Sequence, residues 1–155
     1  MAFLRVEKNV ALSADQAFAI ASDVASYKDF VPMVNRSTIR GDVLRQGNIS
    51  EFSADLSVAY DRMNINESFT SHVVTDSGTK IVTATSDHGP VKSLQAVWKI
   101  VSLSPNQSNI SVEIDYQFKN MLLQVAAGGF MKIGAQRILD AFELRGQSIY
   151  HNKSV

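Results

Sequence analysis

The chain of 155 residues contains no cysteine. This absence excludes disulfide bonds, thiolate zinc sites and cysteine nucleophiles. Neither basic nor acidic residues are in excess, because fifteen of each give a formal net charge of zero. Binding along a nucleic acid needs a basic field, so this balance argues against nucleic acid as the main partner and leaves room only for a local basic patch.

Long apolar runs are absent as well. No run approaches the roughly 18 residues that a membrane-spanning helix needs. The first residues carry charges at Arg5, Glu7 and Lys8, and neither the apolar core of a signal peptide nor an Arg-rich transit peptide is recognisable. The sequence therefore predicts neither an exported protein nor an integral membrane protein.

Motifs that carry catalysis are missing too. His72, His88 and His151 have no metal-ligand spacing to one another, and no nucleophile elbow, phosphate-binding glycine loop or zinc-protease motif occurs. Glu51 and Asp55 share one face of an expected strand whose other face is apolar, so we expect both carboxylates to face solvent. We predict that the protein is not an enzyme and holds no metal and no catalytic cofactor.

The sequence does contain one long helical pattern, from Asn120 to Tyr150. Apolar residues recur three and four positions apart, which predicts a helix with one wide apolar face. The pair Gly128-Gly129 lies inside the pattern and leaves open whether the helix is broken. Near its end, Arg145 either reaches a ligand oxygen or simply suits the negative end of the helix dipole.

Most of the remaining chain has the two-residue period of strands. A first strand over Ala2–Val10 is followed by a helix with a capping box at Ser13 and Gln16, and then by a second short helix that Pro32 ends. Short turns separate the later segments, which predicts an antiparallel meander. These segments lie near Ser37–Leu44, Asn48–Tyr60, Met63–Val74, Lys80–Ser86, Ser93–Leu103 and Asn109–Phe118.

This order of elements predicts an α+β protein of the helix-grip type. A curved antiparallel sheet of about six to seven strands would surround the long C-terminal helix, with two short helices after the first strand. We expect one domain over residues 1–150 and a frayed tail over 151–155. The apolar segment from Tyr27 to Val34 is interpreted either as a lid or membrane-touching tip, or as a buried connector.

Three stretches resemble a known family. They are residues 23–32 (DVASYKDFVP), residues 87–94 (DHGPVKSL) followed by Trp98, and residues 141–145 (AFELR). Their order and spacing resemble the coenzyme Q-binding branch of the polyketide-cyclase/START-like proteins, which includes RatA-type ribosome-association toxins. The chain departs from the family at Met33-Val34, where Trp-Cys is common, and at Val91, where Phe is frequent.

The resemblance implies a hydrophobic tunnel between sheet and helix that binds ubiquinone or a similar polyprenyl lipid. Such a protein would support respiratory electron transport without catalysis, in the bacterial cytoplasm and peripheral at the inner membrane. The ligand-binding residues carried over from the resemblance are Phe30, Val31, Pro32, Met33, Leu56, Val58, Trp98, Phe130, Ile138 and Phe142.

The resemblance also implies an alternative function. A RatA-type toxin would bind the large ribosomal subunit and block subunit association, which requires a basic face for RNA. Arg36, Arg40, Arg45 and Arg62 are the residues that could form one. The expected partners are thus a polyprenyl quinone or other lipid, a transient membrane surface, the large ribosomal subunit and, because a neutral surface repels its neighbours little, a second copy in a homodimer.

Overall fold

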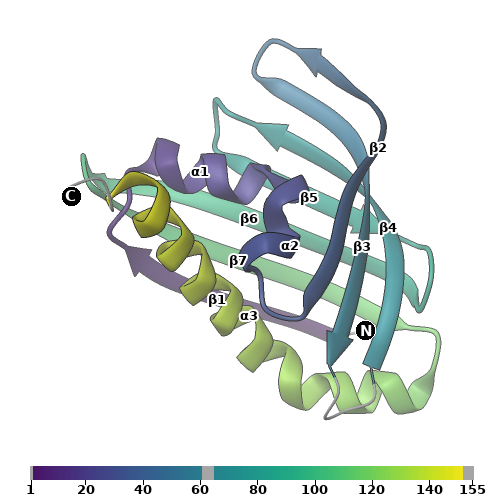
Figure 1. The fold of residues 1–155 in the computed structure, drawn as a ribbon. Helices are drawn as coiled ribbons and strands as arrows, with labels where there is room; N and C mark the ends of the chain where they lie inside the picture. Colours follow the sequence, from purple (N-terminus) through teal and green to yellow (C-terminus); the bar gives the residue numbers. More distant parts are fainter. Residues whose placement is uncertain (1, 61–64, 152–155) are drawn as a thin grey trace.

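The computed structural model describes residues 2–60 and 65–151, and only the backbone of Tyr60, Ile65 and Phe130. A twisted antiparallel sheet of seven strands forms one layer, and helix α3 (Met121–Tyr150) crosses its inner face together with short N-terminal helices (Figure 1). This arrangement confirms the predicted helix-grip fold.

The strands follow one another along the sheet with a single exception. The order is β1-β7-β6-β5-β4-β3-β2, so the first strand pairs with the last and the sheet has β1 and β2 as its two edges. All six pairings are antiparallel, as the short turns predict. The strands are β1 (Ala2–Val10), β2 (Val34–Gln46), β3 (Ile49–Tyr60), β4 (Ile65–Asp76), β5 (Ile81–Ser86), β6 (Val91–Ser104) and β7 (Gln107–Phe118).

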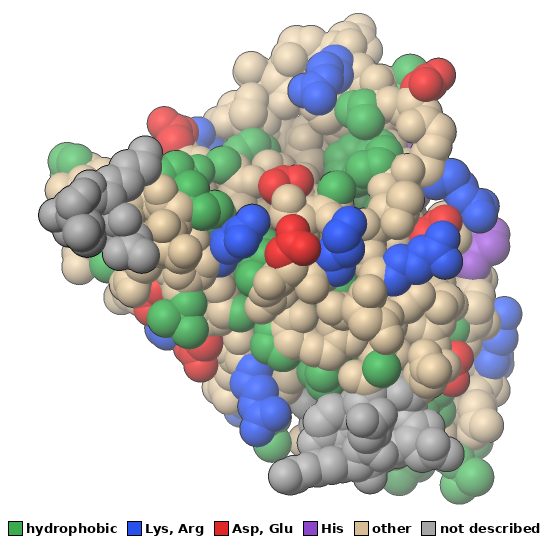
Figure 2. Space-filling view, in the orientation of Figure 1, with side chains coloured by type: hydrophobic (Ala, Val, Ile, Leu, Met, Phe, Trp, Pro, Cys, Tyr) green, Lys and Arg blue, Asp and Glu red, His purple; other side chains and the backbone are tan. Residues whose placement is uncertain are grey.

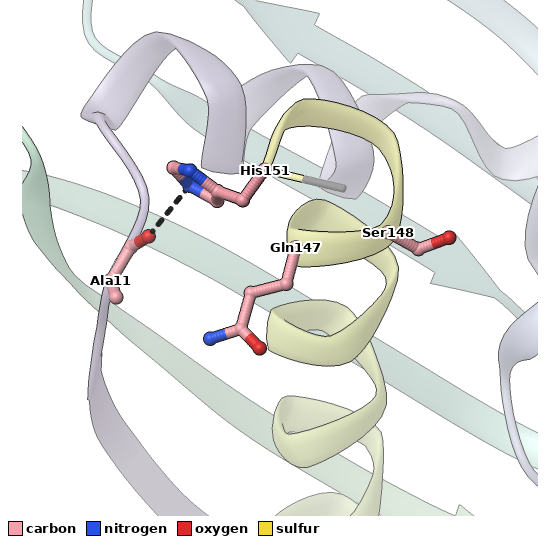
Figure 3. A pocket seen from close by; sticks show the side chains of 4 residues that line it. All are labelled: Ala11, Gln147, Ser148 and His151. Atoms are coloured by element: carbon pink, nitrogen blue, oxygen red, sulfur yellow. Dashed lines mark hydrogen bonds between the residues drawn. The ribbon is translucent and has the colours of Figure 1, made fainter. Parts of the chain in front are cut away.

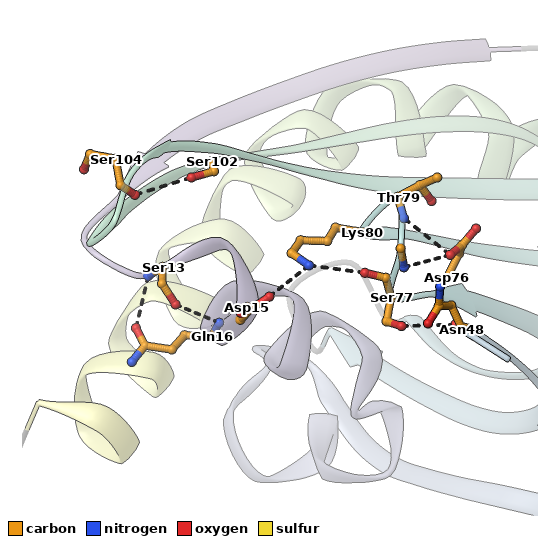
Figure 4. A network of polar contacts seen from close by, with 11 residues as sticks. Ser13, Asp15, Gln16, Asn48, Asp76, Ser77, Thr79, Lys80, Ser102 and Ser104 are labelled. Atoms are coloured by element: carbon orange, nitrogen blue, oxygen red, sulfur yellow. Dashed lines mark hydrogen bonds and ion pairs between the residues drawn. The ribbon is translucent and has the colours of Figure 1, made fainter.

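Helix α1 (Ala14–Ser22) begins at the predicted capping box. The backbone N–H of Gln16 donates to Ser13 Oγ at 3.1 Å, and the N–H of Ser13 donates to Gln16 Oε1 at 3.0 Å (Figure 4). Asp15 in the first turn pairs with Lys80 at 2.9 Å, which ties the helix to the start of β5. The 3₁₀ turn η1 (Val24–Ser26) and helix α2 (Tyr27–Phe30) then lead into β2.

Helix α3 runs unbroken through Gly128 and Gly129, which answers the question that the sequence left open. A methyl group at either glycine would meet no atom within 4 Å, so neither is required for close packing. Gly146 is different, because a methyl group there would lie 2.5 Å from both terminal carbons of the buried Leu12. The missing side chain at Gly146 therefore lets α3 lie directly against Leu12.

An ion-pair cluster fixes the second half of α3 to β1. Lys8 Nζ lies 2.7 Å from Asp140 and 3.0 Å from Glu143, and Glu143 also accepts the backbone N–H of Ala11 at 2.9 Å. Its hydrogen bonds to Asp140 and Glu143 raise the pKa of Lys8 above the usual value. These contacts hold only the second half of the helix. The first half lies at the lower edge of the view in Figure 1, away from this ion-pair cluster.

Candidate functional site

An aromatic cluster fills the interior beneath the second half of α3. The Phe142 side chain is 0% exposed, and its ring stacks on Trp98 of β6 with centroids 4.8 Å apart. Tyr27 and Phe30 each lie 5.6 Å from the same ring. The fold thus brings together Phe30, Trp98 and Phe142, three residues predicted to line a ligand tunnel, but it packs them against one another.

Tyr27 anchors this cluster with a polar contact. Its phenol donates a hydrogen bond to the backbone carbonyl of Ala21, while the ring is buried between α2 and α3. Burial raises the pKa of Tyr27 well above its usual value, and the nearby negative charge of Asp23 acts in the same direction. The hydroxyl therefore stays protonated and acts as a fixed donor.

The segment from Tyr27 to Val34 closes over the cluster. Val31 is buried, Pro32 is half-buried, and the carbonyl of Met33 accepts the N–H of Ala59 at 2.9 Å. The Met33 methyl group comes close to α3, because a methyl group added to Gly134 would lie 3.6 Å from it. Of the two interpretations of this segment, these contacts support the buried connector.

A hollow of about 510 Å³ opens beside this connector, on the outside of α3. The Arg145 guanidinium lies 5.1 Å from the centre of the Phe30 ring, within the distance of a cation–π contact. The sequence allows two roles for Arg145, contact with a ligand oxygen or an interaction with the helix dipole. The observed contact with the Phe30 ring is a third role and supports neither of the two. The hollow is lined by Phe30, Pro32, Arg137, Asp140, Ala141, Leu144, Arg145 and Ser148.

The inner face of the sheet is less completely covered away from the aromatic cluster. Leu56 and Val58 of β3, Ile114 of β7 and Ile138 of α3 are only half-buried although they face inward. Leu56, Ile114 and Ile138 also pack against the buried core, and β4, β5 and β6 separate β3 from β7, so the residues do not form one strip. Half-buried apolar side chains of this kind can contact an apolar ligand. Of the predicted lining residues, Leu56, Val58 and Ile138 are half-buried in this way, whereas the side chain of Phe130 lies outside the described part of the chain.

The interior offers little chemistry. Within residues 2–60 and 65–151, the buried polar side chains apart from tyrosine are serines and a threonine, and no carboxylate, histidine, lysine or arginine is buried. The same residues contain no group of three His, Cys, Asp or Glu side chains that could hold a metal ion. The described interior can therefore bind and orient an apolar molecule but presents no buried acid or base.

The outer face of the sheet carries a polar groove that the sequence analysis missed. A hollow of about 280 Å³ includes Arg36 and Arg40 of the edge strand β2 and the hydroxyls of Ser57, Ser68 and Thr70. A second hollow of about 530 Å³ shares Thr70 and His88 with the first and adds further hydroxyls, His72 and the carboxylates of Asp87 and Asp115. The alternation of polar residues at 53, 55 and 57 and at 68, 70 and 72 was the signal that could have revealed this groove.

The fold brings two of the four arginines proposed for a basic face together. Arg36 and Arg40 share the first of these hollows, and Arg40 Nε lies 3.2 Å from Asp55. Arg45 is exposed near the far end of β2, and Arg62 lies outside the described residues. Glu51, like Asp55, lies on the outer face as the alternation predicted.

A further hollow, of about 460 Å³, lies at the end of α3 against the connection between β1 and α1 (Figure 3). His151 Nε2 lies 3.1 Å from the carbonyl oxygen of Ala11, and the backbone N–H of His151 donates to Gln147 at 2.9 Å. His151, which we expected in the frayed tail, thus anchors the helix end; residues 152–155 lie outside the described part. No described helix is long and apolar enough to cross a bilayer.

The long helix that crosses the inner face of the curved sheet defines a helix-grip protein of the START-like class. The chain belongs to the polyketide cyclase / dehydrase and lipid transport family, whose model matches residues 10–143. The resemblance seen in the sequence is therefore confirmed at the level of the family.

Individual proteins of known name resemble the chain along most of its length. The ribosome association toxin RatA of Escherichia coli K12 is 29% identical over 91% of this chain and 84% of its own. The mitochondrial coenzyme Q-binding protein COQ10 of Drosophila melanogaster is 28% identical over 90% of this chain but 57% of its own. The Zhui aromatase/cyclase of Streptomyces sp. R1128 has the same fold, with a TM-score of 0.81, 14% identity and 99% coverage of both chains.

Proposed function

We propose that this chain is a ribosome-association protein of the RatA type. The observation that carries the proposal is its similarity to RatA, which extends over 84% of that relative, whereas the similarity to COQ10 spans little more than half of the longer chain. Quinone transport was the first hypothesis from the sequence. The comparisons support the alternative more strongly.

The polar groove on the outer face supplies a surface suited to RNA. Arginines and hydroxyl groups are the side chains that most often contact phosphate and sugar oxygens. Arg36 and Arg40 lie beside the hydroxyls of Ser57, Ser68 and Thr70 in one hollow. Both arginines belong to β2, an edge strand of the sheet that a large partner can reach. The side chain of Arg40 is exposed although its partner Asp55 is half-buried, so a phosphate group can reach and compete for the guanidinium.

Co-sedimentation with purified large ribosomal subunits tests this proposal. We expect the wild-type protein to bind at low salt, and the double variant Arg36→Gln, Arg40→Gln to bind more weakly and to lose about two units of salt dependence, one for each phosphate contact removed. Arg5→Gln is the matched control, because Arg5 lies on the opposite edge strand and is also paired with a carboxylate, Glu7, at 2.9 Å. A wild-type protein that does not sediment with the subunit even at low salt would contradict the proposal.

A second candidate function is the binding of an elongated apolar ligand such as a polyprenyl quinone. It is supported by the half-buried apolar side chains of Leu56, Val58 and Ile114, by the words "lipid transport" in the family's description and by the COQ10 relative. Burying the isoprenoid chain would stabilise the complex by about 25 cal/mol per Å² of apolar area removed from water. The aromatic cluster is packed ring against ring, so such a ligand would contact the half-buried residues outside it.

Thermal unfolding with a short-chain quinone tests the second candidate. A ligand at one hundred times its dissociation constant should raise the free energy of unfolding by about 2.7 kcal/mol, and Leu56→Asn should remove most of that gain. Leu103→Asn is the control, because Leu103 is an exposed leucine near the far end of β6. If quinone leaves the wild-type melting temperature unchanged, the inner face of the sheet is not a quinone site.

The absence of catalysis stays a prediction. The family's description covers cyclases, and the similar Zhui structure is that of an aromatase/cyclase. The proposal that this chain only binds rests on the described interior, where no acidic or basic side chain is buried.

A further inference from the structure

The first half of α3 exposes large apolar side chains on its outward face. Met121 is 77% exposed, Leu122 80% and Val125 74%, and Ile133, two turns further on, is also exposed. Gly128 and Gly129 lie between them with no atom near the position of a side chain. Figure 1 places this half of the helix at the lower margin of the molecule, and in Figure 2 a few hydrophobic side chains are visible at that rim.

This pattern is unusual because the inward face of the same half is apolar too. Ala127 is completely buried and Leu123 is half-buried. A helix that is apolar on all sides is normally buried. The second half of α3 has the ordinary pattern instead, with Asp140 exposed and bound to Lys8.

The charged residues along this stretch of the sequence have one sign. From Lys119 to Leu139 the sequence contains Lys119, Lys132 and Arg137 and no acidic residue. All three cations are exposed. Exposed apolar side chains interspersed with lysine and arginine are typical of helices that lie in the interface of an anionic membrane.

We propose that this face, residues 119–137, docks flat on the surface of an anionic lipid bilayer. Met121, Leu122, Val125 and Ile133 enter the headgroup region, and Lys119 and Lys132 contact the lipid phosphates. The helix lies on the bilayer and does not cross it, in agreement with the absence of a membrane-spanning helix among the described residues. The inference goes beyond the proposed function, because it concerns binding to a lipid surface. Such binding requires neither ribosomes nor quinone and can be measured with plain vesicles.

Vesicle co-sedimentation of the full chain tests the inference. We expect the wild type to bind phosphatidylcholine vesicles that contain phosphatidylglycerol. The variant Leu122→Gln, Val125→Gln should bind these vesicles at least about tenfold more weakly, since two side chains that would enter the interface are lost. The variant Lys119→Gln, Lys132→Gln should lose up to about 30-fold on the anionic vesicles and little on phosphatidylcholine alone.

Matched controls separate docking from misfolding. Leu144→Gln alters a leucine that is 66% exposed in the second half of the same helix, and Lys99→Gln removes an exposed lysine of β6. Both should bind like the wild type, and circular dichroism should show that every variant is folded.

Two results would overturn the proposal. The wild type could fail to bind anionic vesicles, or the Leu122 and Val125 variant could bind as well as Leu144→Gln. If vesicle binding is absent and sedimentation equilibrium without lipid shows a dimer that this variant abolishes, the occupant of the face is a second copy of the chain and not a membrane.

Discussion

Replacing Phe142 by alanine is expected to lower the free energy of unfolding by about 3–5 kcal/mol. The side chain is fully buried and contacts three other aromatic rings, from β6 and α2. Because the surrounding side chains are closely packed, they cannot move to fill the cavity that its removal leaves. Domains of this size are usually stable by only about 5–15 kcal/mol, so the loss is a large share of the total. Urea unfolding measures it directly.

The sequence provides a built-in reporter for this experiment. Trp98 is the only tryptophan, and its indole stacks on Phe142, so tryptophan fluorescence reports on the packing of the cluster itself. Phe3→Ala is the control, because Phe3 is exposed on the edge strand β1, and it should change stability by no more than about 0.5 kcal/mol. If Phe142→Ala costs less than about 1 kcal/mol, the interior is not close-packed, and the tunnel originally predicted at this position becomes the better description.

The order of the elements could be predicted from the sequence because local patterns determine it. The expected helix over 120–150 is observed as Met121–Tyr150, with Asn120 as its cap. The sequence predicts that β2 starts near residue 37, whereas the strand begins at Val34. At this end Val34 pairs with Val58, and the N–H of Ala59 donates to the carbonyl of Met33; both contacts are made with another strand and leave no local signal.

The filling of the interior could not be predicted in the same way. Alternation in a strand shows which face of the sheet a side chain occupies, but not whether the space opposite it is filled. Trp98 and Phe142 belong to different elements, and only the three-dimensional fold shows that their rings stack. The exposed face of α3 was hidden for a related reason, since an apolar helical pattern does not reveal which of its residues lack a partner.

Alkaline pH is expected to destabilise the protein through Tyr27. Burial raises the pKa of this phenol, so the folded state keeps a proton that the unfolded chain releases at about pH 10. The stabilising contribution is complete below pH 10 and is lost as the pH rises toward the folded-state pKa, at up to about 1.4 kcal/mol per pH unit. By pH 12 the loss should be on the order of 2–3 kcal/mol, measured as the change in urea unfolding free energy with pH.

The variant Tyr27→Phe isolates this effect because it removes the ionisable group and keeps the ring. At neutral pH the variant should be less stable than the wild type by about 1 kcal/mol, since the hydrogen bond to Ala21 is lost. Above pH 10 the wild type should lose stability faster, so the two curves should cross before about pH 12. Lys8, whose raised pKa also makes stability fall at alkaline pH, is present in both proteins and cancels in the comparison. Parallel curves would mean that Tyr27 ionises without unfolding, and hence that water reaches the aromatic interior beneath α3.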